Sequence, residues 1–137
     1  MSGTLKIAGT VLATNPSNSK VEIDDAVNGK GICKAWVRFD GNPYSASPIP
    51  ISSQYNVSSV TSSAVGRYNI HFNNNLADSD FSVLVTAGEV FSPSTPSYGV
   101  VNAVDASYVT IALWSLGTSG STYTYADSDL VSVAIFR

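Results

Sequence analysis

The sequence has little of the chemistry from which most catalytic and metal sites are built. Its 137 residues include one cysteine and one histidine, which excludes an internal disulfide and a zinc site built from several Cys and His ligands. A nucleophile activated by an imidazole base would depend entirely on His71. We therefore predict no metal site, no cofactor and no enzymatic activity.

Charged residues are also scarce. They make up 12% of the chain, whereas 44% of the residues are hydrophobic. This composition is typical of a folded domain rich in uncharged polar residues rather than of a disordered chain. The net charge of −3 comes without a basic cluster, which disfavours nucleic acid as a partner. No apolar run reaches the roughly 18 to 20 residues of a membrane helix, so we expect no membrane insertion.

Helix-forming patterns are nearly absent as well. No window shows a sustained i, i+3, i+4, i+7 apolar spacing, and Ser, Thr, Val, Asn and Gly dominate over the good helix formers. Apolar segments separated by turn residues instead predict a single all-β domain, an antiparallel β-sandwich or a barrel-like fold. The expected strands are residues 5–12, 21–23, 34–39, 55–61, 67–72, 81–86, 100–104, 108–116 and 130–136.

The expected strands differ in how many of their faces are apolar. Residues 67–72 alternate between apolar and polar side chains, which predicts one buried face and one solvent-exposed face that carries His71. Residues 108–116 and 130–136 are largely apolar on both faces, and a second subunit is a natural source of cover for them. We therefore predict a homo-oligomer. The side chains that we expect at or near its subunit interface are Trp36, Trp114, Leu116 and Phe136.

Acidic pairs are the remaining candidates for catalysis. Two carboxylates across a cleft can hydrolyse a glycosidic bond, which leaves a small depolymerase as an alternative function. Each pair lies in a short turn-like segment, where Asp commonly accepts hydrogen bonds from backbone amides, and we favour that structural role. The pairs are Asp24 with Asp25, Asp78 with Asp80, and Asp127 with Asp129.

Three connections combine turn residues with tyrosines. Residues 42–50 and 92–99 hold five of the six prolines, and we expect both to be stiff surface loops, whereas residues 117–122 form a more flexible connection that leads into 123–125. Tyrosine binds sugars and protein surfaces at low entropic cost, although packing within the chain or between subunits is the alternative for each ring. The tyrosines that we expect to contact a receptor are Tyr44, Tyr98, Tyr123 and Tyr125.

Four blocks of the sequence resemble a known family. Residues 33–41 read CKAWVRFDG, residues 55–61 YNVSSVT, residues 66–72 GRYNIHF and residues 131–137 VSVAIFR. In this order they are similar to the C-terminal domain of tail-fibre and related virion structural proteins of tailed phages, including cyanophages. The resemblance covers residues 33–137, and the Ala-Trp-Val-x-Phe-x-Gly pattern at 35–41 is its most specific part.

The resemblance implies an all-β, homotrimeric virion protein, made in the host cytoplasm and often placed at the end of a fibre that contacts a host surface glycan or protein. Residues 1–32 are then expected to be a β attachment segment that joins other virion proteins, and residues 33–137 a fibre-tip-like domain. A capsid decoration or baseplate subunit without receptor binding is the alternative. Because the loops at 42–50 and 92–99 depart from the family pattern, we expect them to carry specificity.

Overall fold

The chain divides into two compact units in a computed structural model, one formed by residues 1–32 with Arg137 and the other by residues 33–136. The structure describes residues 3–7, 10–15, 22–23, 32–42, 47–88, 97–116 and 122–137. In the first unit, β1 (Gly3–Ile7) pairs antiparallel with β2 (Thr10–Asn15), and β2 pairs with β3 (Glu22–Ile23). The prediction of one strand over residues 5–12 is wrong, because a continuous apolar run does not distinguish one strand from the two arms of a tight hairpin.

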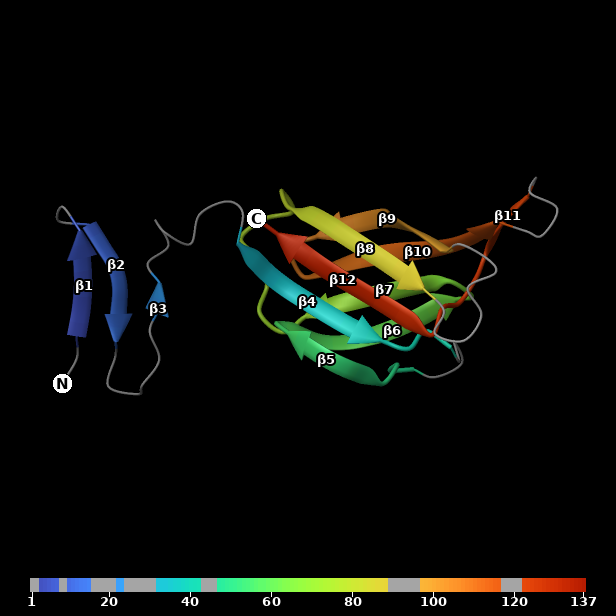
Figure 1. Cartoon of the computed structure of the whole chain (residues 1–137), viewed down its shortest axis with the longest axis horizontal. Helices are drawn as coiled ribbons and strands as arrows, with labels where there is room; N and C mark the ends of the chain where they lie inside the picture. Colours follow the sequence, from blue (N-terminus) through green and yellow to red (C-terminus); the bar gives the residue numbers. More distant parts are fainter. Residues whose placement is uncertain are drawn as a thin grey trace. The chain divides into compact units, whose positions relative to one another are not determined.

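The second unit contains two antiparallel sheets packed face to face, with no helix among its described residues (Figure 1). One sheet has the strand order β5-β4-β12-β8. In the other, β10 lies between β9 and β7, β6 lies beyond β7, and β11 pairs with the end of β10 that β7 does not reach. The all-β sandwich predicted from the sequence is confirmed. The strands are β4 (Cys33–Phe39), β5 (Ile51–Tyr55), β6 (Val57–Ala64), β7 (Arg67–Phe72), β8 (Ser82–Gly88), β9 (Ser97–Asp105), β10 (Tyr108–Leu116), β11 (Tyr123–Tyr125) and β12 (Leu130–Phe136).

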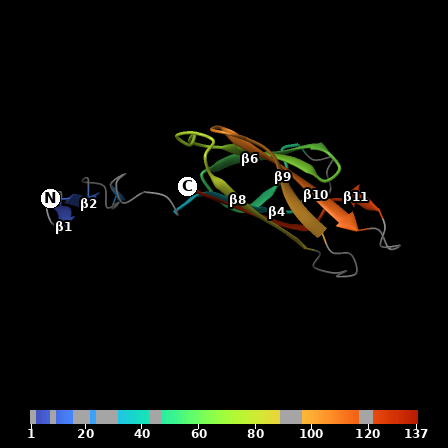
Figure 2. The ribbon, with the colours of Figure 1, turned by 90° about the horizontal axis from the view of Figure 1, so that it is seen from above.

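Side-chain alternation along the strands builds the core between the two sheets, which Figure 2 shows as two layers. On β4, the side chains of Ala35, Val37 and Phe39 are at most 1% exposed, whereas the residues between them face solvent. Phe39 meets the buried ring of Tyr68 on β7 edge to face, with centroids 5.2 Å apart. Burial of a side chain as large as Val37 or Phe39 contributes on the order of 1.5 to 3 kcal/mol of transfer free energy. The predicted half-buried strand at residues 67–72 is confirmed as β7.

The two-faced apolar strands β10 and β12 are the central strands of their sheets. Val109, Ile111 and Leu113 point into the core, and Ala112 on the opposite face of β10 is still only 1% exposed. The second face of β10 is therefore covered in part by its own chain. For this strand the apolar pattern does not by itself require a second subunit, because a small side chain is hidden by larger neighbours on adjacent strands.

One predicted strand corresponds to parts of two strands in the structure. The segment 55–61 is split at Asn56, which has φ 53° and separates β5 in one sheet from β6 in the other. Asparagine tolerates this left-handed conformation. The Asn56 side chain also donates to the carbonyl of Lys34 at 3.2 Å and accepts from the amide of Asn74 at 2.8 Å. These long-range bonds fix the crossover between the sheets, and an apolar pattern does not reveal them.

Candidate functional site

Aromatic side chains gather on the outer face of the sheet that contains β10. Trp114 on β10 is directly opposite Tyr98 on β9, which pairs with one edge of β10. It is also directly opposite Tyr125 on β11, which pairs with the other edge of β10. Directly opposed residues of antiparallel strands share one face of the sheet. Tyr123 lies opposite Leu116, which is two residues after Trp114 on β10 and therefore on the same face. Three consecutive strands of the chain therefore bring four aromatic rings together on one face.

Two of these rings, those of Trp114 and Tyr125, stack on each other. The ring centroids of Trp114 and Tyr125 are 3.8 Å apart and their planes are inclined by 34°. The guanidinium carbon of Arg67 lies 4.1 Å from the centroid of the Tyr125 ring, within the range of a cation–π contact. Nε of Arg67 is buried and has no hydrogen-bond partner, which indicates that ring contact rather than hydrogen bonding holds this part of the side chain. We call these residues, with Tyr98 and Tyr123, the aromatic surface.

The other two rings of the aromatic surface reach into solvent. Tyr98 is 48% exposed and Tyr123 is 59% exposed. Their centroids are 6.3 Å apart with planes inclined by 69°, an edge-to-face arrangement. Each ring offers an apolar face and a hydroxyl that can donate and accept hydrogen bonds. The pair can therefore bind a ligand that has both apolar and hydrogen-bonding groups.

A turn between β6 and β7 fixes the backbone on both sides of the stacked pair. Gly66 in this turn has φ 64°, a conformation that suits glycine. Its carbonyl accepts a hydrogen bond from the amide of Leu113 at 2.7 Å, and the carbonyl of Leu113 accepts one from the amide of Ala126 at 3.2 Å. Leu113 precedes Trp114, and Ala126 follows Tyr125. The stacked rings are thus held by strand pairing and by these additional bonds.

The predicted receptor-contact residues are largely brought together. Tyr98, Tyr123 and Tyr125 all belong to the aromatic surface, whereas Tyr44 lies outside the described residues. The assignment of Tyr98 to a loop is wrong, because Ser97–Gly99 begins β9. Tyr123–Tyr125, into which the flexible connection was expected to lead, forms β11. Both segments pair with the long strand β10, Ser97–Gly99 along one edge and Tyr123–Tyr125 along the other edge, where β10 extends past β7.

The predicted interface residues fall on two different faces. Trp114 and Leu116 lie on the face that carries the aromatic surface. Trp36 and Phe136 belong to β4 and β12 of the other sheet, where Trp36 is 37% exposed. No partner chain is needed to explain the position of Trp114, because it stacks on Tyr125. A role of these four residues at a subunit interface stays a prediction.

Arg67 is the residue of this surface that the sequence did not single out. The alternation of β7 places it on the polar face with His71, and the structure agrees. Its contact with Tyr125 joins residues 58 positions apart in the sequence. Only the strand register, which places Arg67 opposite Ala112 and Tyr125 opposite Trp114, makes them neighbours. No local sequence pattern carries that register.

The candidates for catalysis are spread over the domain. The ring of His71 lies 6.0 Å from that of Tyr108, on the outer face of its sheet. Asp78 accepts a hydrogen bond from the amide of Asp80 at 3.0 Å, which is the expected turn-capping role. Asp24 and Asp25 lie outside the described residues. Within the part of the chain that the structure describes, no three His, Cys, Asp or Glu side chains form a group able to hold a metal ion.

No helix in the described segments is long and apolar enough to cross a membrane. In comparisons with known proteins, no family model, no curated protein and no solved structure matches the chain.

Proposed function

We propose that the chain is a non-enzymatic virion structural protein, a phage tail-fibre or fibre-tip subunit that assembles as a homotrimer and binds a host surface glycan or protein. The binding part of the proposal depends on one observation, the aromatic surface. In it, two exposed tyrosines lie beside the stacked rings of Trp114 and Tyr125. A fixed ring loses little conformational freedom on binding, so such a surface favours recognition. The virion part is supported by the sequence resemblance over residues 33–137.

The aromatic surface favours recognition over a purely structural role for two reasons. Tyr98 and Tyr123 are about half exposed, although rings of this size usually bury more of their surface when they serve only packing. The rings also come from rigid strands, and sites built on strands hold their geometry better than sites on loops. A capsid decoration or baseplate subunit would use the same surface to contact another virion protein.

The test measures binding of labelled protein to intact cells from a panel of bacterial strains. In the strain bound best, replacing Tyr98 and Tyr123 together by alanine is expected to weaken binding at least tenfold, about 1.4 kcal/mol, without lowering the melting temperature. The control is Tyr108→Ala, which removes a tyrosine from the opposite end of the same face. Equal binding by the double variant and the wild type would place the receptor contact elsewhere.

Two further outcomes separate the alternatives. Loss of the protein from assembled particles in the double variant, with no cell binding by the wild type, would favour the decoration or baseplate role. Release of reducing sugar from bacterial polysaccharide by the purified protein would contradict the non-enzymatic part of the proposal and support the depolymerase.

A further inference from the structure

A groove runs over the outer face of the sheet β5-β4-β12-β8, away from the aromatic surface. It has a volume of about 390 Å³, a size typical of small-ligand sites. Its floor is formed on β12 by the small side chains of Ser132 and Ala134. Its walls are Trp36 and Arg38 on β4 and Leu84 and Thr86 on β8. The groove exists because β12 carries small residues between two strands with larger ones.

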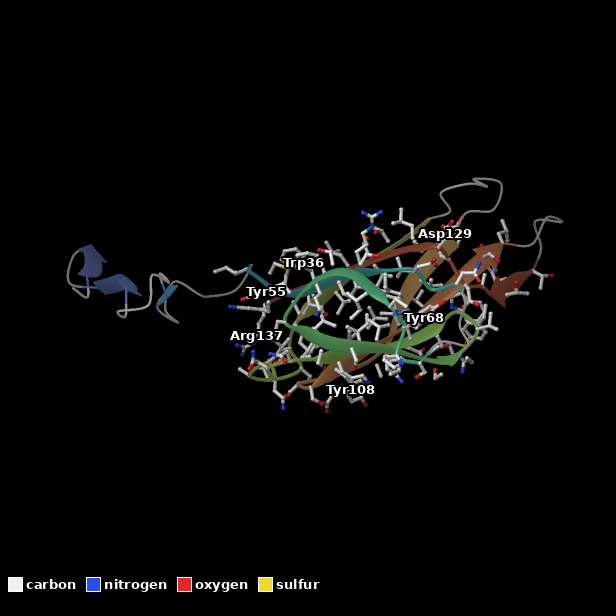
Figure 3. All side chains as sticks on the ribbon, turned by 90° about the horizontal axis from the view of Figure 1, so that it is seen from below. Trp36, Tyr55, Tyr68, Tyr108, Asp129 and Arg137 are labelled. Carbon is white, nitrogen blue, oxygen red and sulfur yellow. The ribbon has the colours of Figure 1, made fainter. Side chains whose placement is uncertain are left out.

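Strand register divides the groove into an apolar row and a polar row. The apolar row crosses all four strands in the order Tyr55, Trp36, Ala134, Leu84. The polar row lies two residues along each strand, about 6.8 Å away, in the order Ser53, Arg38, Ser132, Thr86. Figure 3 shows Trp36 and Tyr55 next to each other on this outer face. A ligand in the groove therefore meets an apolar surface on one side and hydrogen-bonding groups on the other.

The large side chains of the apolar row are accessible to a ligand. Trp36 is 37% exposed, Tyr55 57% and Leu84 60%. Trp36 was predicted to lie at a subunit interface, but its position beside a row of hydroxyl and guanidinium groups favours a ligand with polar substituents. A flat apolar ring face with several hydroxyl groups fits this combination, and pyranose sugars have that shape.

The charges of this sheet have one sign. Its four strands contain two charged residues, Lys34 and Arg38, and both are cations in a chain of net charge −3. They lie on either side of Trp36 on the outer face of β4, because Ala35 and Val37 between them are buried. Among the described residues, Arg38 has no hydrogen-bond or ion-pair partner for its guanidinium. An arginine of this kind is suited to bidentate recognition of a carboxylate.

We propose that this groove binds a carboxylate-bearing sugar residue, such as the uronate of an acidic polysaccharide. The apolar face of the pyranose ring lies on Trp36 above Ala134. Its carboxylate pairs with Arg38, and Ser132 and Thr86 hydrogen-bond to ring hydroxyls. This site lies on the opposite sheet from the aromatic surface and does not depend on the receptor contacts proposed there. Two cations are too few to favour a nucleic acid, whose affinity grows with the number of neutralised phosphates.

The probes are polygalacturonate and its methyl ester, which keeps the ring and removes the negative charge. Calorimetric titration of the full chain at low salt is expected to detect binding to polygalacturonate that weakens at least tenfold when the carboxylates are esterified. Trp36→Ala and Arg38→Gln are each expected to lower the affinity for polygalacturonate at least tenfold, whereas Arg38→Gln leaves any residual binding to the ester unchanged. Both side chains are partly or fully exposed, so the melting temperature is expected to stay within a few degrees of the wild-type value.

Three results would overturn the proposal: no binding to polygalacturonate, equal binding to the ester, or binding that Trp36→Ala and Arg38→Gln do not weaken. Tighter binding of poly-L-glutamate or oligo-dT through the same two residues would also overturn it, in favour of an acidic peptide or a single-stranded nucleic acid. The Tyr98→Ala, Tyr123→Ala double variant is the matched control. It is expected to bind polygalacturonate like the wild type, so that failure of the aromatic surface and failure of the groove are distinguished.

Discussion

The hydroxyl of Tyr68 lies 2.6 Å from Oδ1 of Asp127. The same carboxylate oxygen accepts a hydrogen bond from the amide of Gly66 at 2.7 Å, and the hydroxyl also lies 3.0 Å from the carbonyl of Gly41. One fully buried tyrosine thus ties β7 to the chain that follows β11 and to the chain that follows β4. Asp127 was predicted to cap a local turn, whereas the structure shows that it joins segments about 60 residues apart.

Replacing Tyr68 by phenylalanine is expected to lower the free energy of unfolding by about 1 to 3 kcal/mol, because Asp127 then loses a hydrogen-bond donor at a partly buried site. Urea unfolding of Tyr68→Phe, Asp127→Asn and the double variant would measure the coupling between the two side chains in a double-mutant cycle. Tyr108→Phe is the control, since no hydrogen bond of its hydroxyl is expected to be lost. Strictly additive effects would contradict a direct Tyr68–Asp127 interaction.

The same contact makes stability depend on pH at the alkaline end. Burial and then the hydrogen bond to Asp127 raise the pKa of Tyr68 far above the ordinary tyrosine value of about 10. The unfolded chain therefore loses this proton at a lower pH than the folded chain does. The stabilisation is fully present below about pH 10 and decreases as the pH rises above it. In urea unfolding from pH 8 to pH 11, the wild type is expected to lose more stability than Tyr68→Phe. Parallel pH profiles would contradict the raised pKa.

The fold class and the alternation of buried residues could be predicted from the sequence, because both depend on local period-2 patterns. Residues 67–72 and 108–116 have the same bounds in the structure as in the prediction. The register between strands could not be predicted, since it depends on contacts between distant segments. Register is what places Tyr98, Trp114 and Tyr125 in one row and sets Trp36 opposite Ala134 on the floor of the groove. The exposed tyrosines could therefore be chosen as residues, but their shared surface and the groove could not.

Gly99 is expected to tolerate no side chain, because β9 approaches β8 closely at this point. A Cβ at Gly99 would lie 2.7 Å from Cβ of Val85 and would also overlap its Cγ1. Gly99→Ala is therefore expected to lower the free energy of unfolding by about 1 to 3 kcal/mol, the usual effect of overpacking.

Gly88→Ala is the matched control, since its Cβ would meet only Cδ2 of Leu130 at 3.9 Å. Thermal unfolding compares the two variants, and partial rescue of Gly99→Ala by Val85→Ala would identify the clash as the cause. Equal melting temperatures for the two alanine variants would contradict the close approach.

The predicted homotrimer is most directly tested at β9, whose outer edge has no paired strand among the described residues. Val101 and Val104 on this strand are 41% and 43% exposed, and Asp105 at its end is its one charged residue. Monomeric proteins usually protect such an edge with charge, so an apolar one favours contact with another chain.

Sedimentation at micromolar concentration is expected to show a species of about three times 14.4 kDa. Val101→Lys with Val104→Lys is expected to convert it to the monomer while the β-sheet circular dichroism is kept, whereas Val65→Lys, at a position 38% exposed in the turn between β6 and β7, leaves it intact. A wild-type chain that sediments only at 14.4 kDa would contradict the trimer. A trimer that survives both lysines would move the interface away from β9, toward the face that carries Trp36 and Phe136.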